Sequence, residues 1–145
     1  MDSARWLLMG GGVVSGLISL LHVVLALKPE LYRDIGPGGG SVLTEKAVQG
    51  SIGIVAVTFA LAFLFAVWAL YGFSGAGIIG KLPFLRTFII TIGVIYILRS
   101  LFIIQETRMV LSQGYPVRFL VFSGIALVAG LLYLVGVFTL RQETV

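Results

Sequence analysis

Four long apolar stretches constrain the fold of this chain more than any other feature of its sequence. They cover residues 6–27, 45–71, 84–104 and 117–140. Each is close to the roughly 20 residues that an α-helix needs to cross a bilayer. Inside lipid every backbone N–H and C=O needs a partner within the protein, which a helix supplies within one segment, whereas the alternating pattern of a membrane β-barrel is absent. We therefore predict an all-α integral membrane protein.

The composition supports this prediction, because the apolar excess cannot be buried inside so small a protein. Of the 145 residues 59% are hydrophobic and 11% are charged, against about 45–50% and about 25% in soluble domains. Small domains bury the smallest share of their surface, so many of these side chains must face lipid. We expect one domain, residues 1–145, with membrane lipid as a partner. The first stretch is longer than the roughly 7–15 apolar residues of a signal peptide, so we expect a retained helix.

Short connections join the four stretches, which predicts that successive helices are antiparallel. The expected architecture is a four-helix up-down-up-down bundle. Both termini then lie at one end, here called side A, together with the connection near residues 72–83. The other two connections, near residues 28–44 and 105–116, lie at the opposite end, side B. Apart from Arg99, the Lys and Arg residues divide four against five between sides A and B, too evenly for the positive-inside rule to orient the chain.

Several function classes find no support in the residue types present. The ten Lys and Arg residues form no basic run despite a net charge of +4, so we expect no nucleic-acid partner. The chain has no Cys and one His, which excludes thiolate metal sites, disulfides and bis-His haem ligation. No spacing suggests a zinc or di-iron site, and no serine-nucleophile motif is present. We therefore predict no metal and no cofactor, and we favour a non-enzymatic protein over an enzyme.

Polar side chains within the apolar stretches are costly in lipid, so their positions indicate where a function would lie. His22 and Arg99 each lie about five residues from the side-B end of their helix, roughly 7–8 Å inside that boundary. Glu45 and Gln49 lie near the same end of the second stretch. Tyr96 is three residues before Arg99 and shares its helix face. We predict a polar cluster of these five residues, a candidate ligand-binding site that opens toward side B beneath the first connection as its lid.

Structural roles for the same side chains are the competing interpretation. Arg99 can extend its guanidinium to the side-B surface or pair with Glu45, and Glu106, seven residues further on, shares its helix face. Glu45 can also be a solvated acid in the first turn of its helix, where the helix dipole favours it. His22 can be a neutral imidazole bonded to a Ser or Gln of a neighbouring helix, and Tyr96 a packing residue whose hydroxyl is satisfied.

Three hypotheses for function follow from these patterns. The favoured one is a non-enzymatic accessory or structural subunit that packs against other membrane subunits or forms a homo-oligomer. It rests on small residues such as Gly12 and Gly16, whose spacing allows close helix contact within the bundle or with a partner. The second is a binding or catalytic site for a small amphipathic or anionic molecule in the polar cluster. The third is a transporter or channel formed by dimerisation, although the side-A half offers no polar path.

The connection between the second and third stretches has a distinctive pattern. It contains Tyr71-Gly72-Phe73-Ser74-Gly75-Ala76-Gly77 and, four residues later, Leu82-Pro83-Phe84-Leu85-Arg86. With His22 late in the first helix and Arg99 late in the third, this segment resembles a family of small bacterial membrane proteins with four helices. The resemblance implies that architecture and a location in the bacterial inner (cytoplasmic) membrane, and it implies no particular activity. The Ser-Gly-Ala-Gly run also favours a helix end with a tight turn, and Pro83 suits the first turn of the next helix.

Overall fold

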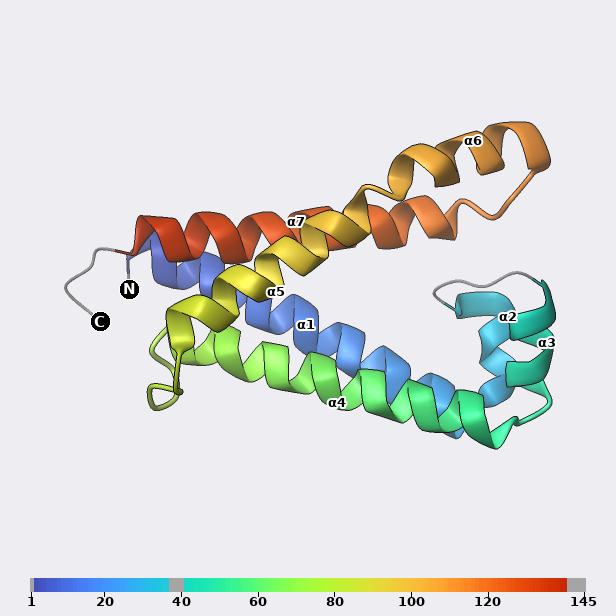
Figure 1. Ribbon diagram of the computed structural model, residues 1–145, viewed down its shortest axis with the longest axis horizontal. Coiled ribbons are helices and arrows are strands. Elements are labelled where there is room, and N and C mark those ends of the chain that lie inside the picture. Colours follow the sequence, from blue (N-terminus) through green and yellow to red (C-terminus); the bar gives the residue numbers. More distant parts are fainter. Residues whose placement is uncertain (1, 37–40, 141–145) are drawn as a thin grey trace.

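The computed structural model describes residues 2–36 and 41–140, and every element in those ranges is a helix. Four helical stretches in the described part are long and apolar enough to cross a membrane (Figure 1). They are α1 (Ser3–Leu27), α4 (Ile52–Gly75), α5 (Leu85–Ser100) continued by α6 (Ile103–Gln113), and α7 (Arg118–Thr139). Three short helices lie between α1 and α4, namely η1 (Pro29–Leu31), α2 (Tyr32–Ile35) and α3 (Ser41–Val48). The prediction of an all-helical chain with four long apolar helices is confirmed.

The second long helix begins later than the sequence predicts, because a glycine turn separates α3 from α4. Gly50 has a φ of 73°, the left-handed conformation that glycine adopts without steric cost. The Gly50 N–H donates to the Ala47 carbonyl (2.9 Å) and the Ser51 N–H to the Lys46 carbonyl (3.1 Å). This pair of bonds is the Schellman motif, which ends a helix by satisfying its last carbonyls. Residues 45–48 therefore belong to a separate short helix.

The third long helix extends further than the sequence predicts, and it is interrupted in the middle. The N–H groups of Leu101 and Phe102 donate to carbonyls three residues back, at Leu98 and Arg99 (both 3.3 Å). The Ser100 hydroxyl also donates to the Ile97 carbonyl (2.6 Å), a contact of the kind that bends helices. Beyond this interruption α6 continues to Gln113, so the polar residues expected in a loop after residue 104 are helical.

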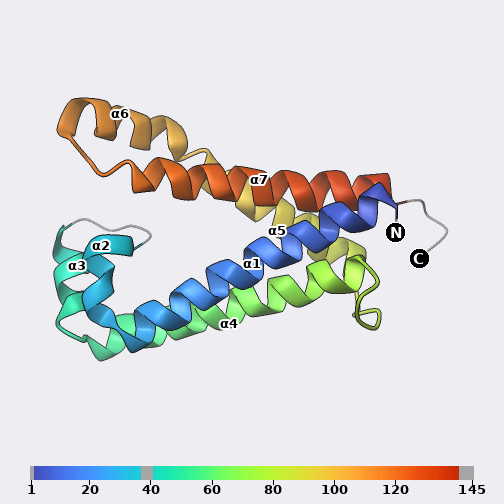
Figure 2. The same ribbon diagram turned by 180° about the vertical axis from the view of Figure 1, so that it is seen from behind.

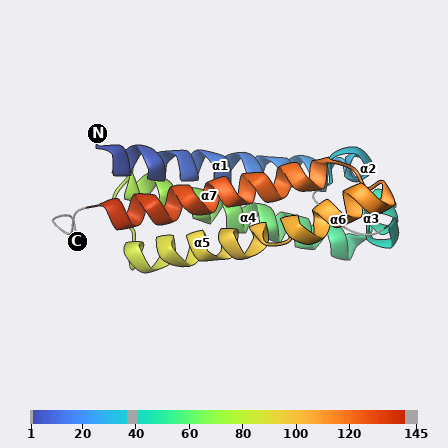
Figure 3. The same ribbon diagram turned by 90° about the horizontal axis from the view of Figure 1, so that it is seen from above.

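The long helices form two pairs, α1 with α4 and α5 with α7. The pairs lie together at the end where α1 begins and α7 ends, and they diverge toward the other end (Figures 1 and 2). Seen from above, α7 lies between α1 and α5, with α4 beneath them (Figure 3). The short helices η1, α2 and α3 occupy the end at which the pairs diverge. We keep the names side A for the end with the termini and side B for the end with α2, α3 and α6.

Glycines allow the helices of each pair to come close. A Cβ on Gly72 would lie 2.6 Å from the Gly12 Cα, so the backbones of α1 and α4 touch at this crossing. In the second pair, a Cβ on Gly130 would lie 3.1 Å from the Gly93 carbonyl oxygen. Small residues such as these let two helix backbones come into direct contact. Gly12, expected at a close helix contact, thus meets a helix of its own chain.

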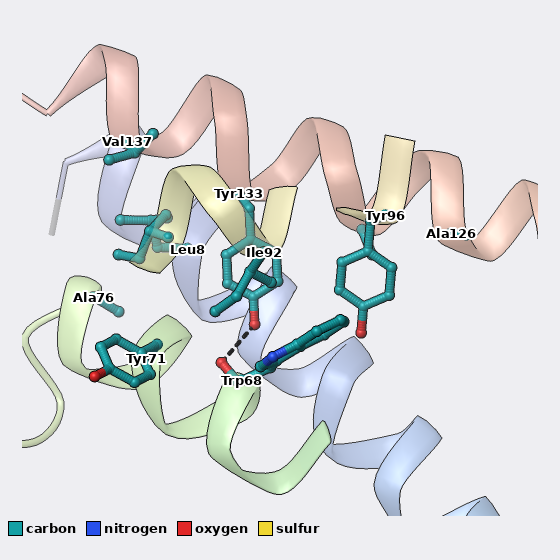
Figure 4. Close-up of a cluster of buried hydrophobic side chains, with 11 residues drawn as sticks. Leu8, Trp68, Tyr71, Ala76, Ile92, Tyr96, Ala126, Tyr133 and Val137 are labelled. Atoms are coloured by element: carbon teal, nitrogen blue, oxygen red, sulfur yellow. Dashed lines mark hydrogen bonds between the residues drawn. The ribbon is translucent and has the colours of Figure 1, made fainter. Parts of the chain in front are cut away.

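The buried core lies in the side-A half, where all four long helices contribute side chains (Figure 4). Leu8 of α1, Ile92 of α5 and Tyr133 of α7 are almost completely buried. The Leu8 side chain fits against α7 because that helix has a glycine there, and a Cβ on Gly136 would lie 2.8 Å from the Leu8 Cγ. Close packing of this kind joins the two helix pairs at side A and leaves them free to separate at side B.

Candidate functional site

A cavity of about 550 Å³ lies between the two helix pairs, on the side-B flank of the buried core. All four long helices line it, and nine of its twelve lining residues are apolar. The apolar walls include Ile18, Leu21, Leu61, Phe65, Phe122 and Ile125. The remaining three lining residues are His22, Tyr96 and Arg99. A pocket of this size with a few polar groups in apolar walls is typical of small-molecule sites.

His22 uses one ring nitrogen for a hydrogen bond within its own helix and has the other available for a ligand. Its Nδ1 lies 2.8 Å from the Ile18 carbonyl oxygen. A carbonyl can only accept, so Nδ1 carries the proton and Nε2 of the neutral ring is an acceptor. The residue is 6% exposed, its ring centroid lies 5.1 Å from that of Phe65, and no described residue bonds to Nε2. His22 therefore offers an acceptor in the cavity wall.

Arg99 joins α5, α6 and α7 through one network. Its guanidinium Nη1 donates to Glu106 Oε1 (3.3 Å) and to Ser123 Oγ (2.9 Å), and the Ser123 hydroxyl donates to Glu106 Oε2. The Arg99 and Glu106 side chains are 38% and 15% exposed. The network holds α6 against α7 across the interruption at residues 101–102, and it compensates the charge of the guanidinium.

Tyr96 belongs to a hydrogen-bonded chain that touches all four long helices. The Tyr133 hydroxyl donates to the Trp68 carbonyl (2.8 Å, Figure 4), so its oxygen must accept the Ser15 hydroxyl proton (3.0 Å). Ser15 Oγ then accepts from the Tyr96 hydroxyl (2.9 Å). Each hydroxyl has one proton, so the chain runs in one direction, from Tyr96 through Ser15 and Tyr133 to Trp68.

Aromatic rings continue this hydrogen-bonded chain into the cavity wall. Trp68 packs edge-to-face on both Tyr96 and Phe65, with ring centroids 5.1 Å apart in each pair. Tyr96 and Tyr133 are stacked at 6.1 Å. Such aromatic pairs contribute about 0.5–1.5 kcal/mol each beyond the area that they bury. The inner wall of the cavity is therefore a rigid part of the core.

The structure brings three of the five predicted site residues together and leaves two outside. His22, Tyr96 and Arg99 line the same cavity. Glu45 lies on α3 and Gln49 directly after it, both exposed and both beyond the Gly50 turn from α4. Neither lines the cavity. The acid beside Arg99 is Glu106, the residue that shares its helix face, so Arg99 pairs within its own hairpin and not with Glu45.

The first connection crosses side B from one helix pair to the other. The Thr58 hydroxyl donates to the Ile54 carbonyl (2.7 Å), so the Tyr32 hydroxyl donates to Thr58 Oγ1 and attaches η1 and α2 to α4. On the far side, Arg118 Nη1 of α7 donates to the Asp34 carbonyl (3.0 Å). The segment from η1 to α2 therefore links α4 to α7 at the end where the pairs diverge, and its role as a lid stays a prediction.

Sequence reasoning missed Ser123 and Tyr133, although the position of Tyr133 left a signal. Tyr133 lies about two turns inside the end of its apolar stretch, away from the boundary positions that aromatic belts occupy, so its hydroxyl required an internal partner. Among residues 2–36 and 41–140, no three His, Asp or Glu side chains gather as a metal site would require. The cavity offers a guanidinium, a ring acceptor and apolar walls, which suits binding more than bond-breaking chemistry.

Comparison with family models, curated proteins and solved structures finds no match for this chain.

Proposed function

We propose that this chain crosses a bilayer four times, as an up-down-up-down bundle, and binds a small amphipathic molecule in the cavity between its helix pairs. The four long apolar helices and the many large apolar side chains on their outer surfaces support membrane insertion. A single observation carries the binding function. The cavity of about 550 Å³ has almost wholly apolar walls and two ionisable side chains, His22 and Arg99, in its lining.

The polar lining indicates what the head of the ligand contains. A guanidinium has five N–H donors, and three of the Arg99 contacts go to Glu106 and Ser123. The remaining donors suit an acceptor such as a carbonyl oxygen, and His22 Nε2 suits a hydroxyl or N–H donor. The apolar walls suit an acyl chain or a ring.

The pairing of Arg99 favours a neutral head over an anionic one. Glu106 already compensates the guanidinium, so a second carboxylate in the cavity would lie near an acid without a free cation to offset it. The sequence leaves both an amphipathic and an anionic ligand open. The geometry favours the amphipathic ligand, and we propose an ester, ketone or alcohol as its head.

The glycines on which the subunit hypothesis rests contact other helices of the same chain in this structure. The close contact made by Gly12 is with Gly72 of the same chain. A Cβ on Gly16 would lie 3.8 Å from the Ala69 Cβ, an ordinary contact that is again internal. Docking to other subunits stays a prediction, and no described contact favours it over the binding function.

Trp68 provides a direct assay of the cavity, because it packs against the wall residues Phe65 and Tyr96. The chain has two tryptophans, so Trp6→Phe leaves Trp68 as the sole reporter. This variant in lipid nanodiscs is titrated with the methyl ester of a mid-chain dibrominated fatty acid, which quenches tryptophan at contact. We expect saturable quenching, and we expect the free acid to bind more weakly than the ester.

A matched pair of substitutions on α7 separates the cavity from the surrounding lipid. Ala126 lines the cavity and is 5% exposed, whereas Val128 is 53% exposed on the outer surface. We expect Ala126→Phe to fill the cavity and weaken quenching at least tenfold, and Val128→Phe to leave it unchanged. Quenching that rises linearly with probe in all variants would refute the proposal, because it would report only lipid-phase contact.

A further inference from the structure

A second cavity, of about 460 Å³, lies at side A, the half in which the sequence offers no polar path. It lies between the first turn of α5, the ends of α4 and α7, and the beginning of α1. Three cations line it, namely Arg5 from α1, Lys81 from the α4–α5 connection and Arg86 from α5. No Asp or Glu is among the lining residues within 2–36 and 41–140. The described lining therefore presents two guanidinium groups, of Arg5 and Arg86, from different helices.

The two arginines lack a carboxylate partner in the described structure. Arg5 and Arg86 are half-buried, and the one ion pair among residues 2–36 and 41–140 is Arg99–Glu106. Asp2 accepts from the Arg5 backbone N–H (3.0 Å) as the cap of α1. The Arg86 guanidinium lies 5.8 Å from the Phe138 ring centroid. Partly buried guanidiniums without an acid favour an anion from outside the chain.

The rest of the lining suits an acyl chain more than a soluble anion. Leu85, Ile89, Val137 and Leu140 form an apolar wall beside the cations. The Ser74 hydroxyl is already used, because it donates to the Gly80 carbonyl (2.9 Å) and accepts from the Leu82 N–H (3.0 Å). Arg5 and Arg86 are thus the anchors for a charged group, and the apolar wall extends from them along α5 and α7.

We propose that this side-A cavity binds the phosphate headgroup of an anionic phospholipid. Arg5 and Arg86 contact the phosphate, and the first part of an acyl chain lies against Leu85 and Val137. Basic pockets between helix ends bind lipid headgroups in this way. The inference rests on the proposed placement of the four helices in a bilayer, and it is independent of any ligand in the side-B cavity.

Lipid binding to the full chain in dodecyl maltoside tests the proposal. Native mass spectrometry measures the affinity for dioleoyl phosphatidylglycerol and for the zwitterionic dioleoyl phosphatidylcholine, which has the same chains. Each cation near a lipid surface contributes about fivefold in affinity, so Arg5→Gln and Arg86→Gln should each weaken phosphatidylglycerol about fivefold. Arg108→Gln is the matched control, because Arg108 is exposed on α6 at side B. The charge-preserving Arg86→Lys should keep most of the affinity.

The comparison of the two lipids on the unmodified chain decides the proposal even where a variant fails to fold. A clear preference for phosphatidylglycerol that both Gln substitutions reduce would support it. Equal affinity for the two lipids would overturn it. Inorganic phosphate that displaces the lipid at millimolar concentration, with the same dependence on Arg5 and Arg86, would overturn the lipid assignment in favour of a soluble anion. Retained quenching of Trp68 by the brominated ester in the same variants would separate this failure from failure of the side-B function.

Discussion

The crossing of α1 and α4 can be tested by two substitutions of the same type with opposite expected effects. Gly72→Ala and Gly16→Ala both add one methyl group within a long helix. At Gly72 the new Cβ would lie 2.6 Å from the Gly12 Cα and 3.0 Å from the Leu8 carbonyl oxygen. Both are backbone atoms, so the helices themselves must move apart. At Gly16 the new Cβ would lie 3.8 Å from the Ala69 Cβ, which is ordinary contact.

The magnitudes follow from two opposing effects. Replacing a helical glycine with alanine stabilises a helix by about 1 kcal/mol, and this gain applies at both positions. Overpacking costs about 1–3 kcal/mol, and at Gly72 the rigid backbone contacts place the cost near the upper end. We therefore expect Gly72→Ala to lower the free energy of unfolding by about 1–2 kcal/mol and Gly16→Ala to raise it by up to about 1 kcal/mol.

Unfolding by sodium dodecyl sulfate in mixed micelles measures this difference. Tryptophan fluorescence follows the transition, and far-ultraviolet circular dichroism checks that each variant begins with the same helix content. Equal stability of the two variants, or a more stable Gly72→Ala, would refute the close crossing of α1 and α4.

Two further predictions concern the polar contacts in the bundle. Tyr133→Phe removes the acceptor of the Ser15 hydroxyl and the donor to the Trp68 carbonyl, so we expect a loss of about 1 kcal/mol in the same unfolding assay. Tyr115→Phe, at a half-buried tyrosine whose described side-chain contact is a ring contact with Phe119, should leave the free energy of unfolding unchanged, and equal effects of the two substitutions would contradict the chain of hydroxyls. Glu106→Gln should cost about 1–2 kcal/mol, less than the roughly 3–5 kcal/mol of a fully buried pair because Arg99 is 38% exposed. The double substitution Arg99→Met/Glu106→Leu should recover most of this loss because it also removes the unpaired guanidinium, and a double variant no more stable than Glu106→Gln would show that the loss does not come from an uncompensated Arg99 charge.

The existence of the long helices was predictable, because apolar length alone identifies a segment that can cross a bilayer. Their boundaries were less so. Residues 45–49 continue the polar-apolar pattern of a helix, and only the Gly50 turn shows that α3 ends before α4 begins. The stretch after residue 104 is polar enough for a loop, yet it forms the helix α6. Glu106 lies in the first turn of α6, where its carboxylate contacts the side chains of Arg99 and Ser123.

The candidate site was predictable in part, because the sequence gives the depth of a residue along its helix but not the course of the chain between helices. Depth along a helix follows from residue counting, which places His22, Tyr96 and Arg99 at similar depth, and the three residues line one cavity. Which acid reaches Arg99 depends on the course of the chain between helices. The break at Gly50 takes Glu45 out of that layer, and the continuation of α6 brings Glu106 into it. The sequence counts the side-A cations only as charges at helix ends far apart along the chain, and only the fold shows that Arg5 and Arg86 share a cavity.

The chain of hydroxyls has a consequence for the order in which the protein assembles. Ser15 is synthesised early, but its partners Tyr96 and Tyr133 follow 81 and 118 residues later. The contact between Gly12 and Gly72 needs no polar partner and is complete once α4 has emerged. The α1–α4 hairpin can therefore form during synthesis, whereas the Ser15 hydroxyl has no partner from α5 or α7 until those helices have been made. The series of hydrogen bonds from Tyr96 through Ser15 and Tyr133 to Trp68 is complete only when α7 has been added. The hydrogen bonds of Ser15 therefore form only once all four long helices have assembled.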